Sequence, residues 1–157
     1  MKKILVLENI RSVHNVGAIF RTADAIGIDE IILVGYTPAP IDRFGRDRED
    51  LHKSALGAEK NISWKQVGDG DLIDELRKMK AAGYKIVSLE QAKDSVDYKK
   101  AEIDFDVVIV VGNEVTGVSS EVLKISDIIA EIPMAGEKES LNVSVATGVL
   151  LFRLFDK

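Results

Sequence analysis

The chain has 157 residues, of which 46% are hydrophobic and 30% charged, and its formal net charge is −5. This length and balance are typical of one globular domain, the absence of cysteine excludes disulfides and thiolate metal sites, and the acidic surplus argues against broad, non-specific binding of nucleic acid. We also expect no metal, because the two histidines lie far apart and no set of acidic residues has a familiar ligand spacing.

The N-terminus has the charge of a signal peptide but not its length. Met1–Lys3 is followed by the apolar run Ile4–Leu7, which is too short for a leader and ends at Glu8. No stretch approaches the length of a membrane span. We therefore expect a first strand at residues 4–7, no association with a membrane and a cytoplasmic location.

The first half of the chain next predicts a helix, a second strand and a long irregular segment. Apolar residues recur at helical spacing after Asn15, which is a good N-cap, and Gly27 supplies a stop. Glu30–Gly35 is typical of a strand. Residues 38–63 hold two prolines and a mixed-charge run, so we expect a long loop with a short helix near Arg48–Ala55. A loop of this length in a compact domain is usually functional or mobile.

The second half continues the alternation of strands and helices. The expected elements are strands at 64–67, 84–89, 106–111 and 128–132, and helices at 71–82, 119–125 and 140–155. Asp106–Val111 is the most apolar strand and should be central. The last helix is apolar almost all round, so we expect one side to pack into the domain and the other against a partner subunit.

This alternation predicts an α/β fold, with one mostly parallel sheet flanked by helices on both faces. We expect a single domain over residues 1–157. Ligands in such folds bind beyond the carboxyl ends of the strands. Three polar segments that carry glycine follow predicted strands, and they are the candidates for a site: Asn9–Arg21, Gly112–Gly117 and Ile132–Ala146.

Each segment alone also has a purely structural explanation. Asn15 and Ser140 are suitable helix caps, and Arg21 could be an ordinary surface arginine, although its planar donors suit phosphate or carboxylate. Glu114 could bind backbone N–H groups of its own loop as readily as a ligand. The glycine spacing of the second segment is neither the dinucleotide fingerprint nor a P-loop. It is the coincidence of three such segments at strand ends that favours one ligand site.

Together the three segments resemble the SpoU–TrmH family, within the SPOUT class of S-adenosylmethionine-dependent RNA methyltransferases. The resemblance covers nearly the whole chain in the family's order. Its motifs correspond here to Asn15, Gly17 and Arg21, then to Gly112, Glu114 and Gly117, and finally to Ile132–Met134 with Ser140–Ala146. The resemblance implies a deep C-terminal trefoil knot, which general rules of chain topology would reject.

The resemblance also implies a methyl-donor site and a homodimer. Each active site borrows residues from the partner, and the subunits meet through the knot region and the C-terminal helix. Three loops hold the S-adenosylmethionine. Their donor-binding residues in this sequence are Leu89, Glu90, Gly112, Asn113, Glu114, Ile132, Met134, Ser140, Leu141 and Asn142.

By the same resemblance, Arg21, Asn15, Ser140, Asn142 and Glu114 are the catalytic candidates for methylation of a ribose 2′-hydroxyl. Because an arginine is a poor base, we expect Arg21 to hold a phosphate and stabilise the developing alkoxide; proton removal by Arg21 is the alternative, and it would require strong burial of the guanidinium. Asn15 would orient Arg21 or the ribose. Ser140 and Asn142 would order the donor pocket and the reacting hydroxyl, and Glu114 would brace the second loop.

The RNA substrate is less defined. Transfer RNA is expected before ribosomal RNA. Its recognition would come from the dimer surface, the 38–63 loop and two basic clusters, Arg43–Arg48 and Arg77–Lys80, although charge alone favours solvated faces for both clusters. Two alternatives stay open: a cofactor-binding α/β module such as a flavodoxin-like regulator, and an RNA-binding relative that lacks activity.

Overall fold

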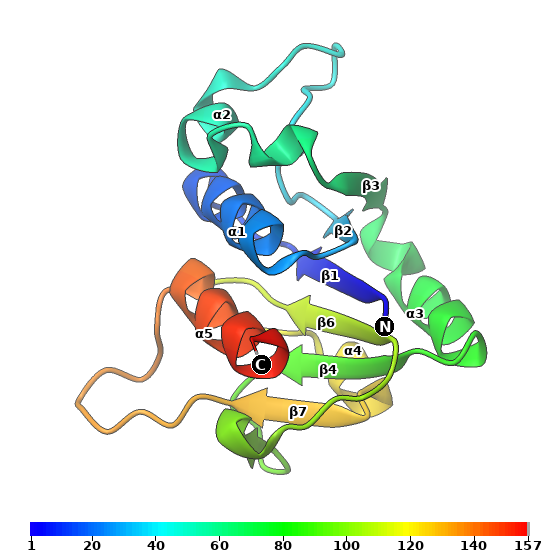
Figure 1. Cartoon of the computed structure of the whole chain (residues 1–157), viewed down its shortest axis with the longest axis vertical. Coiled ribbons are helices and arrows are strands. Elements are labelled where there is room, and N and C mark those ends of the chain that lie inside the picture. Colours follow the sequence, from blue (N-terminus) through cyan, green and yellow to red (C-terminus); the bar gives the residue numbers. More distant parts are fainter. Residues whose placement is uncertain (157) are drawn as a thin grey trace.

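The computed structural model describes residues 1–156, so Lys157, the last residue of the expected domain, lies outside the described part. Its centre is one seven-stranded sheet in the order β3-β2-β1-β6-β4-β7-β5, and every neighbouring pair is parallel (Figure 1). The strands are β1 Lys3–Glu8, β2 Glu30–Val34, β3 Ser63–Val67, β4 Lys85–Leu89, β5 Val96–Asp97, β6 Val107–Val111 and β7 Ile128–Glu131. The predicted parallel α/β architecture is therefore confirmed.

Side-chain alternation along the strands divides the interior into two cores. Leu5 and Leu7 of β1 belong to one core, whereas Ile4 and Val6 belong to the other, as expected when successive side chains point to opposite faces. The first core is covered by α1, α2 and α5, and the second by α3 and α4. The helices are α1 Val13–Ile26, α2 Glu49–Ala55, α3 Leu72–Ala81, α4 Ser120–Ile125 and α5 Val143–Phe155, with single 3₁₀ turns at Ala58–Lys60, Asp69–Asp71 and Tyr98–Lys100.

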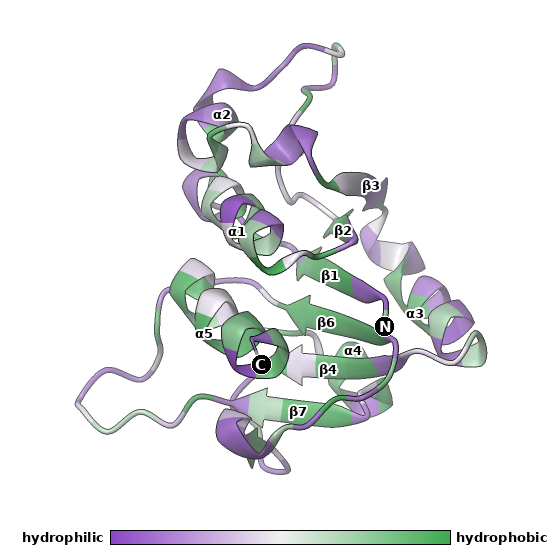
Figure 2. Ribbon diagram, viewed as in Figure 1, coloured by the Kyte–Doolittle hydropathy of each residue, from purple (hydrophilic) through white to green (hydrophobic). Residues whose placement is uncertain are grey.

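The apolar character of the strands explains their order. All five residues of β6 are buried, and β6 lies between β1 and β4, which confirms the central position predicted for it. Figure 2 shows the hydrophobic residues concentrated in these middle strands and on the faces of the helices that cover them.

The two-residue strand β5 was not predicted. The trefoil knot implied by the resemblance stays a prediction. No helix within residues 1–156 is long and apolar enough to span a membrane.

Two helices begin at residues other than those predicted. The N-cap of α1 is Ser12, whose side chain accepts a hydrogen bond from the Asn15 backbone at 3.2 Å, so Asn15 lies inside the first turn. The N-cap of α5 is Asn142, whose side-chain oxygen accepts from the backbone N–H of Ser144 at 2.9 Å. Ser140 thus precedes this helix instead of capping it. In both cases a second polar residue nearby takes the capping role, and the Asn15 side chain contacts Glu114 and Asn142 instead.

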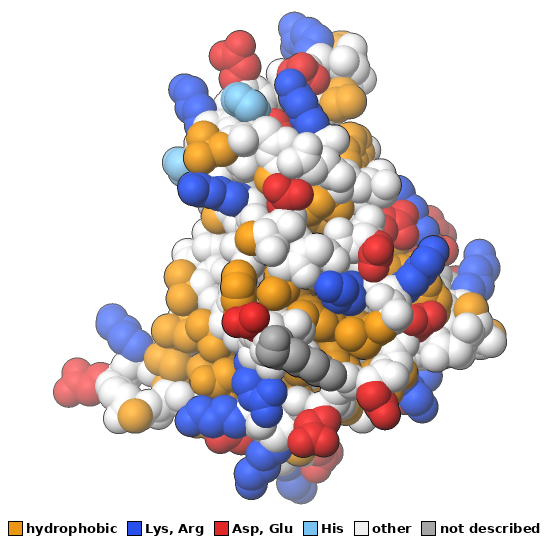
Figure 3. Space-filling model, viewed as in Figure 1, with side chains coloured by type: hydrophobic (Ala, Val, Ile, Leu, Met, Phe, Trp, Pro, Cys, Tyr) orange, Lys and Arg blue, Asp and Glu red, His pale blue; other side chains and the backbone are white. Residues whose placement is uncertain are grey.

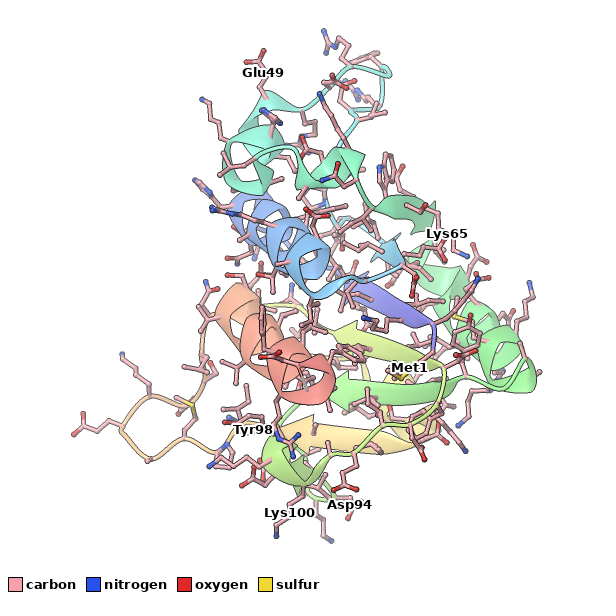
Figure 4. The ribbon with its side chains drawn as sticks, in the orientation of Figure 1. Met1, Glu49, Lys65, Asp94, Tyr98 and Lys100 are labelled. Carbon is pink, nitrogen blue, oxygen red and sulfur yellow. The ribbon has the colours of Figure 1, made fainter. Side chains whose placement is uncertain are left out.

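The long 38–63 segment extends away from the sheet and packs back through α2, which confirms the short helix expected there. It forms the end of the molecule marked by Glu49, opposite the end marked by Asp94 and Lys100 (Figure 4). Gly17 explains the tight contact between α1 and α2, because a methyl group added at Gly17 would lie 2.7 Å from the carbonyl oxygen of Leu51. A motif residue therefore has a packing role.

Candidate functional site

Three loops meet at the carboxyl ends of β4, β6 and β7 and border a cavity of about 720 Å³. Its position agrees with the rule that ligands of parallel sheets bind beyond these strand ends. All ten residues that the sequence analysis assigned to the methyl donor line it. The lining also contains residues that were not assigned to the methyl donor, among them Gln91, Val111, Val115, Thr116, Leu123, Glu131, Glu139, Val143 and Ala146.

Asn113 organises the loop between β6 and α4. Its side-chain oxygen accepts from the backbone N–H groups of Val115 at 2.8 Å and Thr116 at 2.9 Å. Its amide nitrogen donates to the backbone oxygen of Asn9 at 2.9 Å and to the hydroxyl of Tyr36 at 2.8 Å. Asn113 is buried, so these four hydrogen bonds satisfy a group that would otherwise be costly to remove from water.

The two glycines of this loop permit close backbone approach. Gly117 has φ +71°, a left-handed conformation that favours glycine, and a side chain there would overlap the carboxylate of Glu90. A side chain at Gly112 would overlap the backbone of Gly117 and Val118. Glu90 in turn accepts from the backbone N–H of Val118 at 2.8 Å. The carboxylate assigned to the donor site thus also holds the loop in place.

Glu114, Asn15 and Asn142 form a chain of contacts that joins the three sequence motifs. The Glu114 carboxylate accepts from the backbone N–H groups of Arg11 at 3.0 Å and Ser12 at 3.1 Å, and from the Asn15 side chain at 3.3 Å. The side-chain oxygen of Asn15 accepts from the Asn142 amide at 3.1 Å. Glu114 therefore binds backbone amides of the first segment, whereas Asn113 serves the loop that Glu114 was expected to brace.

The electrostatics of Glu114 follow from these contacts. Desolvation by burial acts to raise its pKa, but hydrogen bonds from the backbone N–H groups of Arg11, Glu114 itself and Ser12, and from the Asn15 side chain, outweigh it. The pKa of Glu114 consequently lies below its usual value. The carboxylate is negatively charged at neutral pH, and most of its accepting capacity is already used inside the protein.

The loop before α5 forms the outer wall of the cavity. Ser140 is exposed and lines the cavity, and the same is true of Leu141. The side-chain amide of Gln91 donates to the backbone oxygen of Glu139 at 2.8 Å, which ties this loop to the end of β4. Gln91 was missed by sequence reasoning, because nothing local in the sequence marks a contact across 48 residues.

Arg21 lies apart from this cavity. It is exposed on α1 and is not among the lining residues. The structure thus brings together four of the five catalytic candidates, since Glu114, Ser140 and Asn142 line the cavity and Asn15 binds two of them. The expectation that Arg21 reaches an active site stays a prediction that involves a second subunit.

Sequence reasoning also missed two residues at the ends of β1 and β2. Glu8 is buried, and its carboxylate accepts from the backbone N–H of Ser119 at 3.0 Å, at the end of the loop between β6 and α4. Tyr36 is exposed, but its hydroxyl is held by Asn113. A polar residue that directly follows an apolar strand was the available signal for Glu8, and Tyr36 had no comparable signal.

The basic clusters are largely neutralised. Arg46 pairs with Asp42 at 2.9 Å and Arg48 pairs with Asp50 at 2.7 Å. In the second cluster Lys80 pairs with Asp127 at 3.2 Å and Arg77 with Asp74 at 3.8 Å. No group of three or more potential metal ligands occurs within residues 1–156. The cavity itself is lined by amide, hydroxyl, apolar and carboxylate side chains, and its lining contains no lysine or arginine.

The chain is similar to known methyltransferases over nearly its whole length. The model of the SpoU rRNA Methylase family matches residues 2–152. The tRNA (guanosine(18)-2′-O)-methyltransferase of Aquifex aeolicus is 34% identical over 149 residues, which are 95% of this chain and 66% of that protein. A TrmH-family relative from Staphylococcus saprophyticus is 33% identical and is matched over 59% of its length. The chain thus spans less than two thirds of these curated relatives.

Solved structures resemble the same region. A crystal structure of an AdoMet-bound rRNA methyltransferase from Sinorhizobium meliloti superimposes with a TM-score of 0.83 at 35% identity, over 97% of this chain and 55% of the other. The TrmH/SpoU tRNA-modifying enzyme of A. aeolicus superimposes with a TM-score of 0.83 at 31% identity, over 98% of this chain and 74% of the other.

Proposed function

Because this chain belongs to the SpoU rRNA methylase family, we propose that it transfers a methyl group from S-adenosylmethionine to a ribose 2′-hydroxyl of RNA, with transfer RNA favoured over ribosomal RNA. The observation that carries the proposal is the cavity at the carboxyl ends of β4, β6 and β7, lined by all ten residues that the family resemblance assigns to the methyl donor. The tRNA (guanosine(18)-2′-O)-methyltransferase and the AdoMet-bound rRNA methyltransferase support the reaction class.

The residues of the cavity fit an adenosyl ligand. Its volume of about 720 Å³ lies in the range of small-molecule sites, about 300–1,000 Å³. Leu89, Ile132 and Leu141 offer apolar contact for a purine ring, and the ends of the strands offer backbone hydrogen-bonding groups for its edge. When bound, S-adenosylmethionine supplies an electrophilic methyl group, so the protein must chiefly align the reactants and assist the hydroxyl.

The proposed roles of the polar residues follow from their contacts. Asn142 and Asn15 are joined at 3.1 Å, and Asn15 bonds to Glu114, so these side chains would hold the cavity wall in one arrangement. Arginine is a poor base, so Arg21 would bind phosphate and stabilise the developing alkoxide rather than remove the proton. Ser140 would bind the donor or the reacting hydroxyl.

We further propose that the active protein is a homodimer in which Arg21 serves the partner's cavity. The side of α5 away from the core supports this, because Val145 is 52% exposed and Phe152 is 44% exposed. Figure 3 shows hydrophobic side chains gathered on the face of the molecule that bears α5. A two-fold contact through this helix would bury them. In this proposal the chain acts as one methyltransferase domain in the cytoplasm, where its RNA substrates occur.

A transfer assay tests the reaction. The protein is incubated with methyl-labelled S-adenosylmethionine and, in separate reactions, with transfer RNA and ribosomal RNA, and the modified nucleosides are identified by mass spectrometry. We expect a 2′-O-methyl nucleoside from transfer RNA. A methylated base would contradict the reaction class, and a product only from ribosomal RNA would contradict the substrate preference.

Binding of S-adenosylhomocysteine separates the enzyme from its two alternatives. At about one hundred times its Kd, a ligand specific to the folded state adds about 2.7 kcal/mol of stability, which should raise the midpoint of thermal unfolding of a domain this size by about 5 to 10 °C. An unchanged midpoint at saturating ligand would favour an RNA-binding relative without activity or a module for another cofactor.

A further inference from the structure

A second cavity of about 440 Å³ lies beside the donor cavity. Asn113, Val115 and Thr116 line both cavities, so the loop between β6 and α4 is the wall between them. The opposite side of the second cavity is formed by Arg11, from the segment before α1, and by Tyr36, directly after β2. Arg11 lies within the first segment but is not one of its matched motif residues, and Tyr36 lies outside all three segments.

Tyr36 presents an aromatic ring to solvent in a fixed position. Its side chain is 59% exposed, yet its hydroxyl accepts from the Asn113 amide at 2.8 Å and its backbone N–H donates to the Asn9 side chain at 3.2 Å. The ring is thus held at both ends, which lowers the conformational entropy that a ligand would have to remove. Val115, in the same cavity, is 81% exposed.

Arg11 supplies a cation whose donors are not used within the protein. Its backbone N–H donates to Glu114, but its guanidinium makes no hydrogen bond or ion pair within residues 1–156. By contrast, the guanidinium groups of Arg46 and Arg48 are paired with carboxylates. Glu114 accepts from the Arg11 backbone, from Ser12 and from Asn15, and it forms no ion pair with the Arg11 side chain within residues 1–156.

We propose that this second cavity is a nucleotide subsite for the RNA substrate, in which Tyr36 stacks on an unpaired base and Arg11 binds a phosphate of the same strand. An exposed aromatic ring and an unpaired guanidinium in one cavity are groups that proteins commonly use to bind single-stranded RNA. The subsite lies one loop away from the donor cavity, so it would hold a nucleotide close to the methylated one. The inference rests on the proposed function, because it assumes an RNA substrate at the neighbouring site.

The subsite makes the enzyme prefer target nucleotides in loops or bulges. A base in a continuous duplex is stacked on its neighbours and cannot lie on the Tyr36 ring. Since Asn113 contacts both the ring and the donor loop, Tyr36 could also act as a simple support for that loop. The test therefore has to separate stacking on RNA from support of the donor cavity.

Three variants distinguish stacking on RNA from support of the loop: Tyr36→Ala, Tyr36→Phe and Arg11→Ala. The charge-matched control is Lys124→Ala, which removes one exposed positive charge from α4. For each we would measure KM for transfer RNA, kcat, the Kd of S-adenosylhomocysteine, and the Kd of a single-stranded RNA oligonucleotide against a duplex of equal length. Tyr36→Phe keeps the ring but loses the hydroxyl that Asn113 binds.

We expect Tyr36→Ala to raise KM for RNA and the Kd of the single strand about tenfold, since loss of a base–aromatic stack typically has an effect of this order. Tyr36→Phe should stay within about threefold of the wild type, and Tyr36→Ala should leave duplex affinity and the Kd of S-adenosylhomocysteine within about twofold. Arg11→Ala should weaken binding of the single strand and flatten its salt dependence by a slope of about 0.7, the value for one phosphate contact. Lys124→Ala should change neither.

Three results would overturn the subsite. The first is that the affinity for RNA and the KM for RNA are unchanged in both Tyr36→Ala and Arg11→Ala, although the wild type methylates RNA. Tyr36→Ala and Tyr36→Phe could weaken S-adenosylhomocysteine equally, which would make the tyrosine a support of the donor loop. Tyr36→Ala could change the oligomeric state and leave RNA binding intact, which would assign the ring to a protein interface. Failure of the wild type to methylate any RNA would instead refute the proposed function, and the oligonucleotide binding would still decide the subsite.

Discussion

Replacement of Glu114 with Gln tests the contacts that join the first motif to the second. Oε2 of the carboxylate accepts from Arg11, and Oε1 accepts from Ser12 and Asn15. A glutamine keeps one oxygen, so at least one backbone N–H would face an amide N–H, and the remaining bonds would change from charged to neutral. Hydrogen bonds to charged groups contribute about 1.5–3 kcal/mol and neutral ones about 0.5–1.5 kcal/mol.

The expected loss of stability is smaller than the sum of these differences. The Glu114 side chain is exposed to water, which screens its charge and can hydrate the freed donors. We therefore expect Glu114→Gln to lower the free energy of unfolding by about 1–2 kcal/mol. For a domain of this size that corresponds to a decrease of about 2 to 8 °C in the midpoint of thermal unfolding.

The pH dependence distinguishes this account from a simple packing defect. The pKa of Glu114 is lowered in the folded state, so its charge stabilises the fold above the pKa of the unfolded chain, and that stabilisation is lost as the pH falls through the folded value. The difference between wild type and Glu114→Gln should be complete at pH 7 and should shrink as the pH falls below about 4.5, the ordinary value for a glutamate.

Thermal unfolding followed by circular dichroism at fixed protein concentration measures both quantities, because dimerisation would make the midpoint depend on concentration. Glu121→Gln, an exposed glutamate on α4, serves as the matched control and should change the midpoint little at any pH. If Glu114→Gln is as stable as the wild type at pH 7, or if its deficit is the same at pH 7 and pH 4, the charged hydrogen bonds do not have the assigned effect.

Three further substitutions test other parts of the site. Gly117→Ala should weaken S-adenosylhomocysteine at least tenfold by calorimetry, because the new side chain would overlap the Glu90 carboxylate at a left-handed position; unchanged affinity would mean that the loop does not form the donor site. Gly17→Ala should lower stability by about 1–3 kcal/mol through overlap with the Leu51 carbonyl, and an unchanged urea midpoint would refute that contact. Arg21→Ala should abolish methyl transfer and leave the Kd of S-adenosylhomocysteine unchanged, whereas normal turnover would remove Arg21 from the mechanism.

The positions of the central strand and the first helix could be predicted because their signals are local. The five apolar residues of β6 can be buried on both sides only at the centre of the sheet, and Gly27 ends α1 in the left-handed conformation that glycine favours. The cavity could be located because three segments at strand ends carry motifs that resemble those of one family. The predictions of the strand and the helix are correct because each depends on only a few neighbouring residues.

The errors arise where a distant contact decides between two adequate local choices. Both Ser12 and Asn15 can cap a helix, but Asn15 contacts Glu114, 99 residues away, and Ser12 takes the cap. At α5 the cap is Asn142, and its amide nitrogen remains available for Asn15. The Tyr36–Asn113 bond spans 77 residues and has no local signature. The N-cap propensity of a residue identifies it as a candidate cap, but contacts with distant residues determine which candidate caps the helix.

Because Glu114, Asn15 and Asn142 are in contact, loss of methyltransferase activity in a variant of one of them would not by itself show a catalytic role. Glu114 holds the segment that begins α1, Asn15 joins Glu114 to Asn142, and Asn142 starts α5. A substitution at any of the three would shift two walls of the cavity together, so reduced methylation would follow even if none of them touched the reacting atoms. Arg21 makes no such contact within residues 1–156. Only a residue whose loss abolishes transfer at unchanged donor affinity and stability acts on the reaction itself, and by this criterion Arg21 is the first residue to test.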